Sequence, residues 1–113
     1  MKVYGLKKCS TCQKALEFLV EKKLKVEFTD HQETPPAISQ VAAWSKAVGG
    51  WEKLINKAGY TWRGLDTADT ENLTEAKAVA LATKHTSLIR RPLIEHDDGT
   101  VTVGFTNGVK ALF

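Results

Sequence analysis

The chain has 113 residues, enough for one domain, residues 1–113, with its own hydrophobic core. Hydrophobic residues make up 42% and charged residues 26% of the chain, so its composition excludes a disordered tail, a collagen-like repeat and a coiled-coil rod. No stretch approaches the roughly 18 apolar residues that span a bilayer, and the N-terminus has no signal-peptide pattern. We therefore expect a cytoplasmic protein without a membrane partner, and a monomer.

The net charge of +3 arises in one part of the chain. The first thirty residues hold seven Lys and four Asp or Glu, whereas the remainder is balanced. This excess is too small for a nucleic-acid-binding protein, in which a basic stripe is expected. It predicts only a local positive field near Lys7, Lys8 and Lys14.

The N-terminal third has the pattern of a βαβ unit. Residues 3–6 predict a strand, residues 10–22 a helix, and residues 25–29 a second strand. Ser10 and Gln13 have the spacing of a capping box at the start of the helix. The two strands are then expected to be parallel, with a right-handed crossover.

The remainder of the chain has a helical middle and a ββα end. The pattern predicts helices over residues 37–47, 51–57 and 73–84, with a loop at 61–64. Asp98-Gly99 predicts a hairpin turn between two strands, and residues 107–113 predict a final helix. This order predicts an α/β, thioredoxin-like fold. It has a mixed four-stranded sheet, built from βαβ and ββα halves, and a helical insertion at about residues 35–85.

Cys9 and Cys12 form the first candidate site. A cytosolic protein rarely keeps a structural disulfide, so two cysteines at this spacing indicate redox chemistry or metal binding. Zinc is the weaker interpretation, because it usually takes four ligands and His31, His85 and His96 lack ligand spacing to one another. We interpret these histidines as surface or turn residues and expect no metal and no bound cofactor.

The thiolate is the reactive form of cysteine, and its environment sets how readily it forms. We expect the helix N-terminus, together with Lys7, Lys8 and Lys14, to lower the pKa of Cys9. Cys9 precedes the helix and is the expected exposed nucleophile. Cys12 lies inside the first turn, faces the core and is expected to resolve the product.

A second candidate site follows from a proline near the third strand. In a thioredoxin-like fold this proline packs opposite the cysteine pair and is commonly cis, so we expect a cis bond at Pro92. Arg91 then points into the cysteine site, where a guanidinium binds a carboxylate or oxyanion with two hydrogen bonds. Arg63 and Lys8 are further anion-binding candidates. Arginine pairs and arginines beside aromatics, such as Arg63 beside Trp62, are also common on solvated surfaces.

Five segments match the pattern of a known family: residues 4–9 (Tyr-Gly-Leu-Lys-Lys-Cys), 50–59 (Gly-Trp-Glu-Lys-Leu-Ile-Asn-Lys-Ala-Gly), 61–65 (Thr-Trp-Arg-Gly-Leu), 90–93 (Arg-Arg-Pro-Leu) and 103–105 (Val-Gly-Phe). On these segments the chain resembles the arsenate reductase (ArsC) family, in its Spx/YffB-like branch, over nearly its whole length. The middle segment is the specific part, whereas a lone Cys-x-x-Cys is not. The resemblance implies a thioredoxin-like domain with the family's helical insertion.

The resemblance also implies residue roles. The family's nucleophilic cysteine falls on Cys9, and Spx proteins carry a second cysteine at the position of Cys12. Arsenate reductases of this type use three arginines, of which two match Arg63 and Arg91. The third lies after the last strand, where this chain has Gly and Phe at residues 104–105. Arsenate reduction is therefore disfavoured.

Three functions follow from these residues and from the resemblance. The preferred one is a glutathione-dependent thiol–disulfide reductase, acting on a small disulfide or oxyanion substrate and coupled to glutathione or glutaredoxin. The alternative is an Spx-like redox-sensing regulator that binds the RNA polymerase α subunit and not nucleic acid directly. The third is an arsenate reductase.

Overall fold

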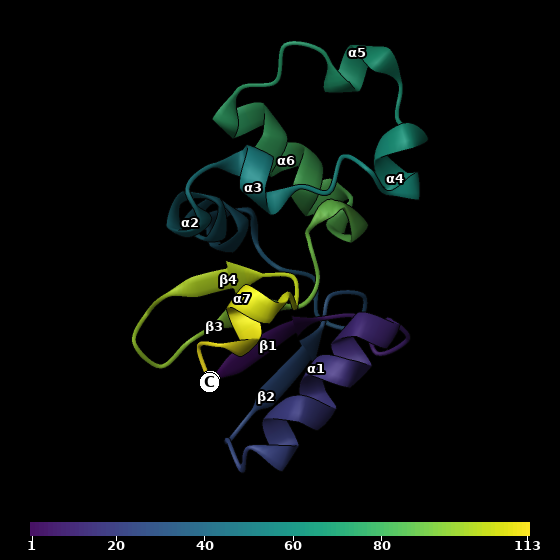
Figure 1. The fold of residues 1–113 in the computed structure, drawn as a ribbon. Helices are drawn as coiled ribbons and strands as arrows, with labels where there is room; N and C mark the ends of the chain where they lie inside the picture. Colours follow the sequence, from purple (N-terminus) through teal and green to yellow (C-terminus); the bar gives the residue numbers. More distant parts are fainter. The chain divides into compact units, whose positions relative to one another are not determined.

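The computed structural model describes all 113 residues, and the chain forms two compact units (Figure 1). The first unit comprises Met1–Thr34 and Arg91–Phe113, and the second comprises Pro35–Arg90. The insertion predicted at residues 35–85 therefore extends to Arg90. None of the helices is long and apolar enough to cross a membrane.

The first unit is built on a four-stranded sheet with the order β2-β1-β3-β4. Its strands are β1 (Lys2–Gly5), β2 (Glu27–Asp30), β3 (Leu93–Glu95) and β4 (Val101–Val103). Strand β1 is parallel to β2 and antiparallel to β3, and β3 is antiparallel to β4. The mixed four-stranded sheet predicted from the order of elements is confirmed.

Helix α1 (Ser10–Glu21) connects the two parallel strands and packs on the sheet through one apolar face. Cys12, Ala15 and Leu19 are buried on this face, at the spacing of one side of a helix. Leu19 forms a core with Val3 and Ile94. Partly buried side chains surround that core: Met1, Leu16, Phe18, Val26, Phe28, Phe105, Val109 and Phe113.

At the C-terminal end the predicted turn is confirmed, and the final helix is shorter than the predicted range of residues 107–113. Gly99 has φ +88°, which a residue with a Cβ rarely adopts, and its N–H donates to the His96 carbonyl at 3.0 Å. The turn joins β3 to β4 as Asp98-Gly99 predicts. Helix α7 (Asn107–Lys110) begins with Thr106 as its N-cap, whose hydroxyl accepts the Val109 N–H at 3.3 Å.

The second unit consists of short helices around its own core. They are α2 (Ile38–Val48), α3 (Trp51–Leu54), α4 (Tyr60–Arg63), α5 (Thr67–Thr70), α6 (Glu75–Lys84) and the 3₁₀ helix η1 (Thr86–Leu88). Helices α2, α3 and α6 pack together and bury Trp44, Leu54 and Val79.

Two sequence-based expectations on helix starts and loops are wrong. Ser10 and Gln13 do not form a capping box, because α1 starts one residue earlier than that motif requires and Cys9 is the N-cap. Gln13 Nε2 instead donates to the Lys7 carbonyl at 2.8 Å. Residues 61–64 were expected to be a loop, but Tyr60–Arg63 form α4. A single helical turn is too short to show apolar periodicity in the sequence.

Candidate active site

Cys9 and Cys12 lie at the start of α1, on the first unit. Cys9 is half-buried, Cys12 is buried, and both are free thiols. The Cys9 N–H donates to the Leu6 carbonyl at 3.0 Å, and the Cys9 carbonyl accepts the Gln13 N–H at 3.0 Å. These bonds fix the backbone on both sides of the sulfur. The more accessible thiol therefore precedes the helix, and the buried one lies within its first turn.

The environment of Cys9 favours the thiolate. Burial opposes it, but the backbone N–H of Cys12, the Arg91 guanidinium, the Cys12 thiol and the backbone N–H of Thr11 interact with the sulfur. Together they lower the pKa of Cys9 below its ordinary value. Free N–H groups at a helix start commonly stabilise an anion in this way. The contribution expected from the helix N-terminus is present, and the guanidinium adds to it.

The nearby lysines have a different role from the one that the sequence suggests. Lys7 Nζ forms an ion pair with Glu33 Oε1 at 2.7 Å, and this contact raises the pKa of Lys7. Lys8 is exposed. The groups that lower the pKa of Cys9 are backbone N–H donors, Arg91 and the Cys12 thiol, not lysines.

The environment of Cys12 favours the neutral thiol. Burial, together with a smaller effect of the neighbouring Cys9, raises the pKa of the Cys12 thiol to about 11, against an opposing interaction with the Leu6 backbone N–H. Its sulfur lies against the backbone of β1, where a Cβ on Gly5 would come within 2.5 Å of it. The absence of a side chain at Gly5 is what leaves room for the second sulfur.

Arg91 and Pro92 open the return segment of the first unit. The Arg91-Pro92 peptide bond is cis, which confirms the expectation for Pro92, and Pro92 is buried. The half-buried Arg91 interacts with the Cys9 sulfur. Arg90, one residue earlier, is exposed and belongs to the second unit. The structure thus brings Cys9, Cys12 and Arg91 together in one unit.

His31 is part of the same surroundings, and the sequence analysis missed it. His31 lies in the turn after β2, as expected, but it is only 1% exposed, so the interpretation as a surface residue is wrong. Its ring stacks on Tyr4 with 6.2 Å between centroids. Burial, followed by the positive charge of Arg91, lowers the pKa of His31 to about 4. The usable signal was its place directly after the second strand, whose end lies beside that of the first in a parallel pair.

Two other anion-binding candidates have distinct surroundings. Lys8 lines a cavity of about 190 Å³ in the first unit, with Lys7, Asp30 and Glu33 among its walls. Arg63 lies in the second unit, on α4. There its guanidinium donates to the Ala58 carbonyl, at 2.6 Å from Nη2 and 3.2 Å from Nε. No group of three or more His, Cys, Asp or Glu is arranged to hold a metal ion.

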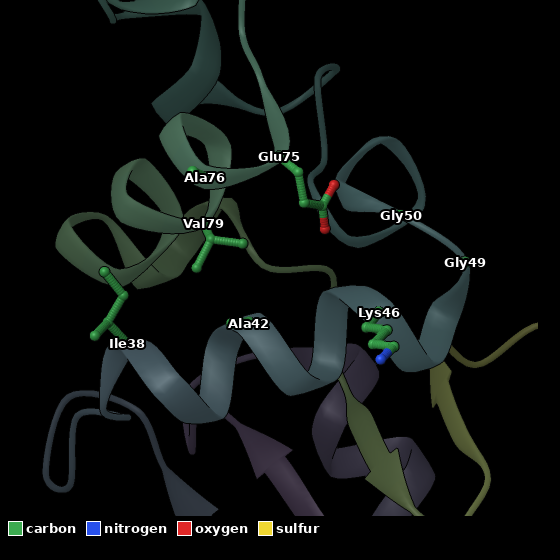
Figure 2. Close-up of a pocket in the computed structure, with 8 residues that line it drawn as sticks. All are labelled: Ile38, Ala42, Lys46, Gly49, Gly50, Glu75, Ala76 and Val79. Atoms are coloured by element: carbon green, nitrogen blue, oxygen red, sulfur yellow. The ribbon is translucent and has the colours of Figure 1, made fainter.

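A larger cavity of about 730 Å³ lies within the second unit, between α2 and α6 (Figure 2). Ile38 and Val79 line one end, and Lys46 and Glu75 lie toward the other. The Glu75 carboxylate already accepts hydrogen bonds from the Ser45 hydroxyl and the Trp51 N–H, which connect α6 to α2 and α3. The cavity holds no thiol or histidine, so we assign it no chemistry.

Comparison with known proteins shows the family of the chain. A family model described as the ArsC family matches residues 4–110. The solved structure of a protein named YFFB is 35% identical, with a TM-score of 0.89, and the match covers 98% of this chain and 96% of that one. The structure of an arsenate reductase (ArsC) related protein from Brucella melitensis is 32% identical, with a TM-score of 0.76, covering 99% and 92%.

A curated relative carries a regulatory name. The global transcriptional regulator Spx of Streptococcus pyogenes is 31% identical over 100 residues, which cover 86% of this chain and 72% of the regulator. The thioredoxin-like α/β fold predicted from the sequence agrees with the sheet and with these structural relatives.

Proposed function

The chain belongs to the ArsC family, and from this membership we propose that it is a thiol–disulfide reductase that uses glutathione as its reductant. The observation that carries the proposal is the contrast between its two thiols. Cys9 is accessible and its pKa is lowered, whereas Cys12 is buried and its pKa is raised. Thiol–disulfide exchange needs one thiol that ionises readily and attacks first, and a second thiol that attacks the mixed disulfide afterwards. Cys9 and Cys12 fit these two roles.

The proposed reaction has three steps. The Cys9 thiolate attacks one sulfur of a substrate disulfide, forms a mixed disulfide and releases the first substrate thiolate, which takes a proton from solvent. Cys12 then gives up its proton and attacks the Cys9 sulfur, releasing the second substrate thiol and leaving a Cys9–Cys12 disulfide. Two glutathione thiols reduce this disulfide by two electrons and become glutathione disulfide.

Arg91 supports the choice of an anionic thiol. Its guanidinium adjoins Cys9, and glutathione carries two carboxylates. An arginine fork can donate two hydrogen bonds to one of these carboxylates, which orients the reacting sulfur as well as binding the molecule. Lys8 offers a second positive charge before Cys9, on an exposed side chain.

The test is turnover with glutathione on several disulfide and oxyanion substrates. The unaltered protein is expected to consume glutathione with at least one disulfide, and Cys9→Ser is expected to have none of this activity. Without glutathione, Cys12→Ser should stop at the mixed disulfide, visible by mass spectrometry, whereas the unaltered protein should go on to the Cys9–Cys12 disulfide. Equal glutathione consumption by the unaltered protein and by Cys9→Ser would contradict the proposal.

Arsenate is the disfavoured substrate in this assay. The segment after the last strand has Gly104 and Phe105 where the resemblance implies an arginine. Losing one preorganised donor to a developing oxyanion costs about 10²–10³ in rate. Given glutathione and glutaredoxin, the protein is expected to reduce arsenate poorly. Robust arsenate turnover would show that this donor is dispensable.

A redox-sensing regulator is the second candidate, favoured by the 31% identity to Spx. In this role the two cysteines switch between dithiol and disulfide without turnover, and the partner is the RNA polymerase α subunit. Titrating purified α subunit against the reduced and the oxidised protein tests it. Binding that depends on the redox state, without glutathione turnover, would favour the regulator over the enzyme.

A further inference from the structure

We propose that Asp30 is the positioning residue for Cys9: its carboxylate ties the loop that carries this thiol to the end of β2. The inference rests on the proposed function only in taking Cys9 as the nucleophile. Asp30 lies outside the cysteine motif, and the residue is 8% exposed. Its role follows from the backbone groups that it binds.

Both carboxylate oxygens of Asp30 accept backbone N–H groups. Oδ2 accepts the Lys7 N–H at 2.8 Å, across the sheet end. Oδ1 accepts the Gln32 N–H at 2.7 Å and the Glu33 N–H at 3.4 Å, within its own turn. These bonds, that of Lys7 first, lower the pKa of Asp30 despite its burial. Oδ1 therefore stabilises the turn that follows β2, and Oδ2 holds the loop that follows β1.

The segment that Asp30 holds leads directly to Cys9. Besides its N–H, Lys7 binds through its backbone carbonyl, which accepts Gln13 Nε2 at 2.8 Å. Lys7 is thereby fixed both to the end of β2 and to the first turn of α1. Lys8 is the one residue between Lys7 and Cys9. The path of this loop sets how the Cys9 sulfur meets the N–H groups of α1.

The register of the sheet explains why this position suits a carboxylate. Asp30 lies opposite Gly5 at the end of the parallel β1–β2 pair, so its side chain is beside the chain as it leaves β1. By charge alone, an acid here would oppose formation of a nearby thiolate. By geometry, it holds the loop in the conformation that stabilises the thiolate. The two effects have opposite signs, which makes them separable by experiment.

Asp30→Asn tests the proposal in the full-length protein. Asparagine has one oxygen, which can keep the local turn, while its NH₂ group would face the Lys7 N–H without accepting it. We expect the midpoint of Cys9 alkylation against pH to rise toward the free-cysteine value of about 8.5. The rate at pH 7 should fall several-fold, with Cys9 and Cys12 resolved by peptide mass spectrometry. Glu33→Gln is the matched control: it breaks the exposed Lys7 ion pair and should leave the midpoint unchanged.

A folded Asp30→Asn variant with an unchanged or lower midpoint would overturn the proposal. A lower midpoint would mean that the charge of Asp30 outweighs its geometry. Hydrogen exchange in the unaltered protein gives a second measurement, which does not depend on the variant folding. The Lys7 amide should be protected, and free exchange at Lys7 would also overturn the proposal. Neither readout involves a substrate, so the proposed reductase activity can fail while this inference holds.

Discussion

Cys9 and Cys12 are only three residues apart, yet their surroundings shift the pKa values of the two thiols in opposite directions. Cys9 lies before α1, where free N–H groups and Arg91 stabilise its negative charge. Cys12 lies one turn on, where burial stabilises its neutral form. Both residues are cysteines, so the difference in pKa comes from position: Cys9 precedes the first residue of α1, and Cys12 lies within its first turn. In the proposed reaction this asymmetry makes Cys9 the first thiol to react and Cys12 the second.

Arg91 is expected to matter for anion binding, with Arg90 as its internal control. Arg91→Ala should weaken glutathione binding roughly tenfold or more, because hydrogen bonds to charged groups contribute about 1.5–3 kcal/mol each. Arg91→Lys should also impair binding, since it keeps the charge and loses the planar fork. Arg90→Ala, at an exposed side chain, should leave binding unchanged. Titration calorimetry measures all three, and equal effects at both arginines would remove this support for glutathione.

Gly5→Ala is expected to destabilise the protein through Cys12. The new methyl group would lie 2.5 Å from the Cys12 sulfur, closer than side-chain atoms pack. Overpacking of this kind costs about 1–3 kcal/mol of unfolding free energy. In a Cys12→Ala background the cost should shrink, because the sulfur is gone. Urea denaturation measures both.

Gly108→Ala is the matched control for that substitution. Its new methyl group would meet the Thr106 hydroxyl at an ordinary 3.7 Å, so stability should be kept or slightly raised. An equal cost of Gly5→Ala in the presence and absence of the Cys12 sulfur would contradict the steric explanation.

At the scale of elements, α6 shows how one helix start organises its neighbours. Its N-cap, Thr74, accepts the Lys77 N–H at 3.3 Å. The next residue, Glu75, accepts the Ser45 hydroxyl of α2 and, at 3.1 Å, the Trp51 N–H at the start of α3. A single helical turn thus joins the three helices that enclose the core of the second unit.

Thr74→Ala is expected to lower the unfolding free energy by about 1 kcal/mol, the usual cost of losing an N-cap. Thr70→Ala is the control, because the Thr70 hydroxyl only donates to the Thr67 carbonyl of its own turn, at 3.3 Å. Its effect should stay within about 0.5 kcal/mol. Chemical denaturation of both variants measures the difference, and equal effects would show that the Thr74 cap contributes nothing.

At the scale of the whole molecule, His31 makes stability depend on pH. The unfolded chain protonates this histidine near pH 6.5, whereas the folded protein resists protonation until about pH 4. Between these values the unfolded state binds more protons, so stability falls as pH falls through this window. The full loss amounts to about 3 kcal/mol.

Replacing His31 with Phe should flatten the dependence of unfolding free energy on pH between about 4 and 6.5. The ring would keep its stacking surface toward Tyr4 and lose the group that titrates. His85→Gln, at a half-buried histidine of the second unit, is the control. Thermal unfolding at several pH values measures the slopes, and an unchanged slope in the Phe variant would mean that other groups carry it.

The sequence alone determined most of the architecture, because the signals involved are local. Alternation and helical spacing predicted the four strands, α1, α2 and α6 to within a few residues, and Asp98-Gly99 predicted the turn between β3 and β4. The order of these elements then predicted the mixed sheet, since a βαβ crossover joins parallel strands and a short hairpin turn joins antiparallel ones. The cysteine pair, and the different exposures of its members, also followed from position relative to the helix start.

Only the tertiary structure decided which side chains complete the site. The return of the chain at Arg91 brings a guanidinium to Cys9. The parallel register of β1 and β2 buries His31 and places Asp30 against the loop before Cys9. Sequence spacing cannot report such contacts, because Lys7 and Asp30 are 23 residues apart and meet only when the sheet has formed. The lysines next to the motif suggested the wrong source of positive charge for the same reason: proximity in sequence does not set proximity to the sulfur.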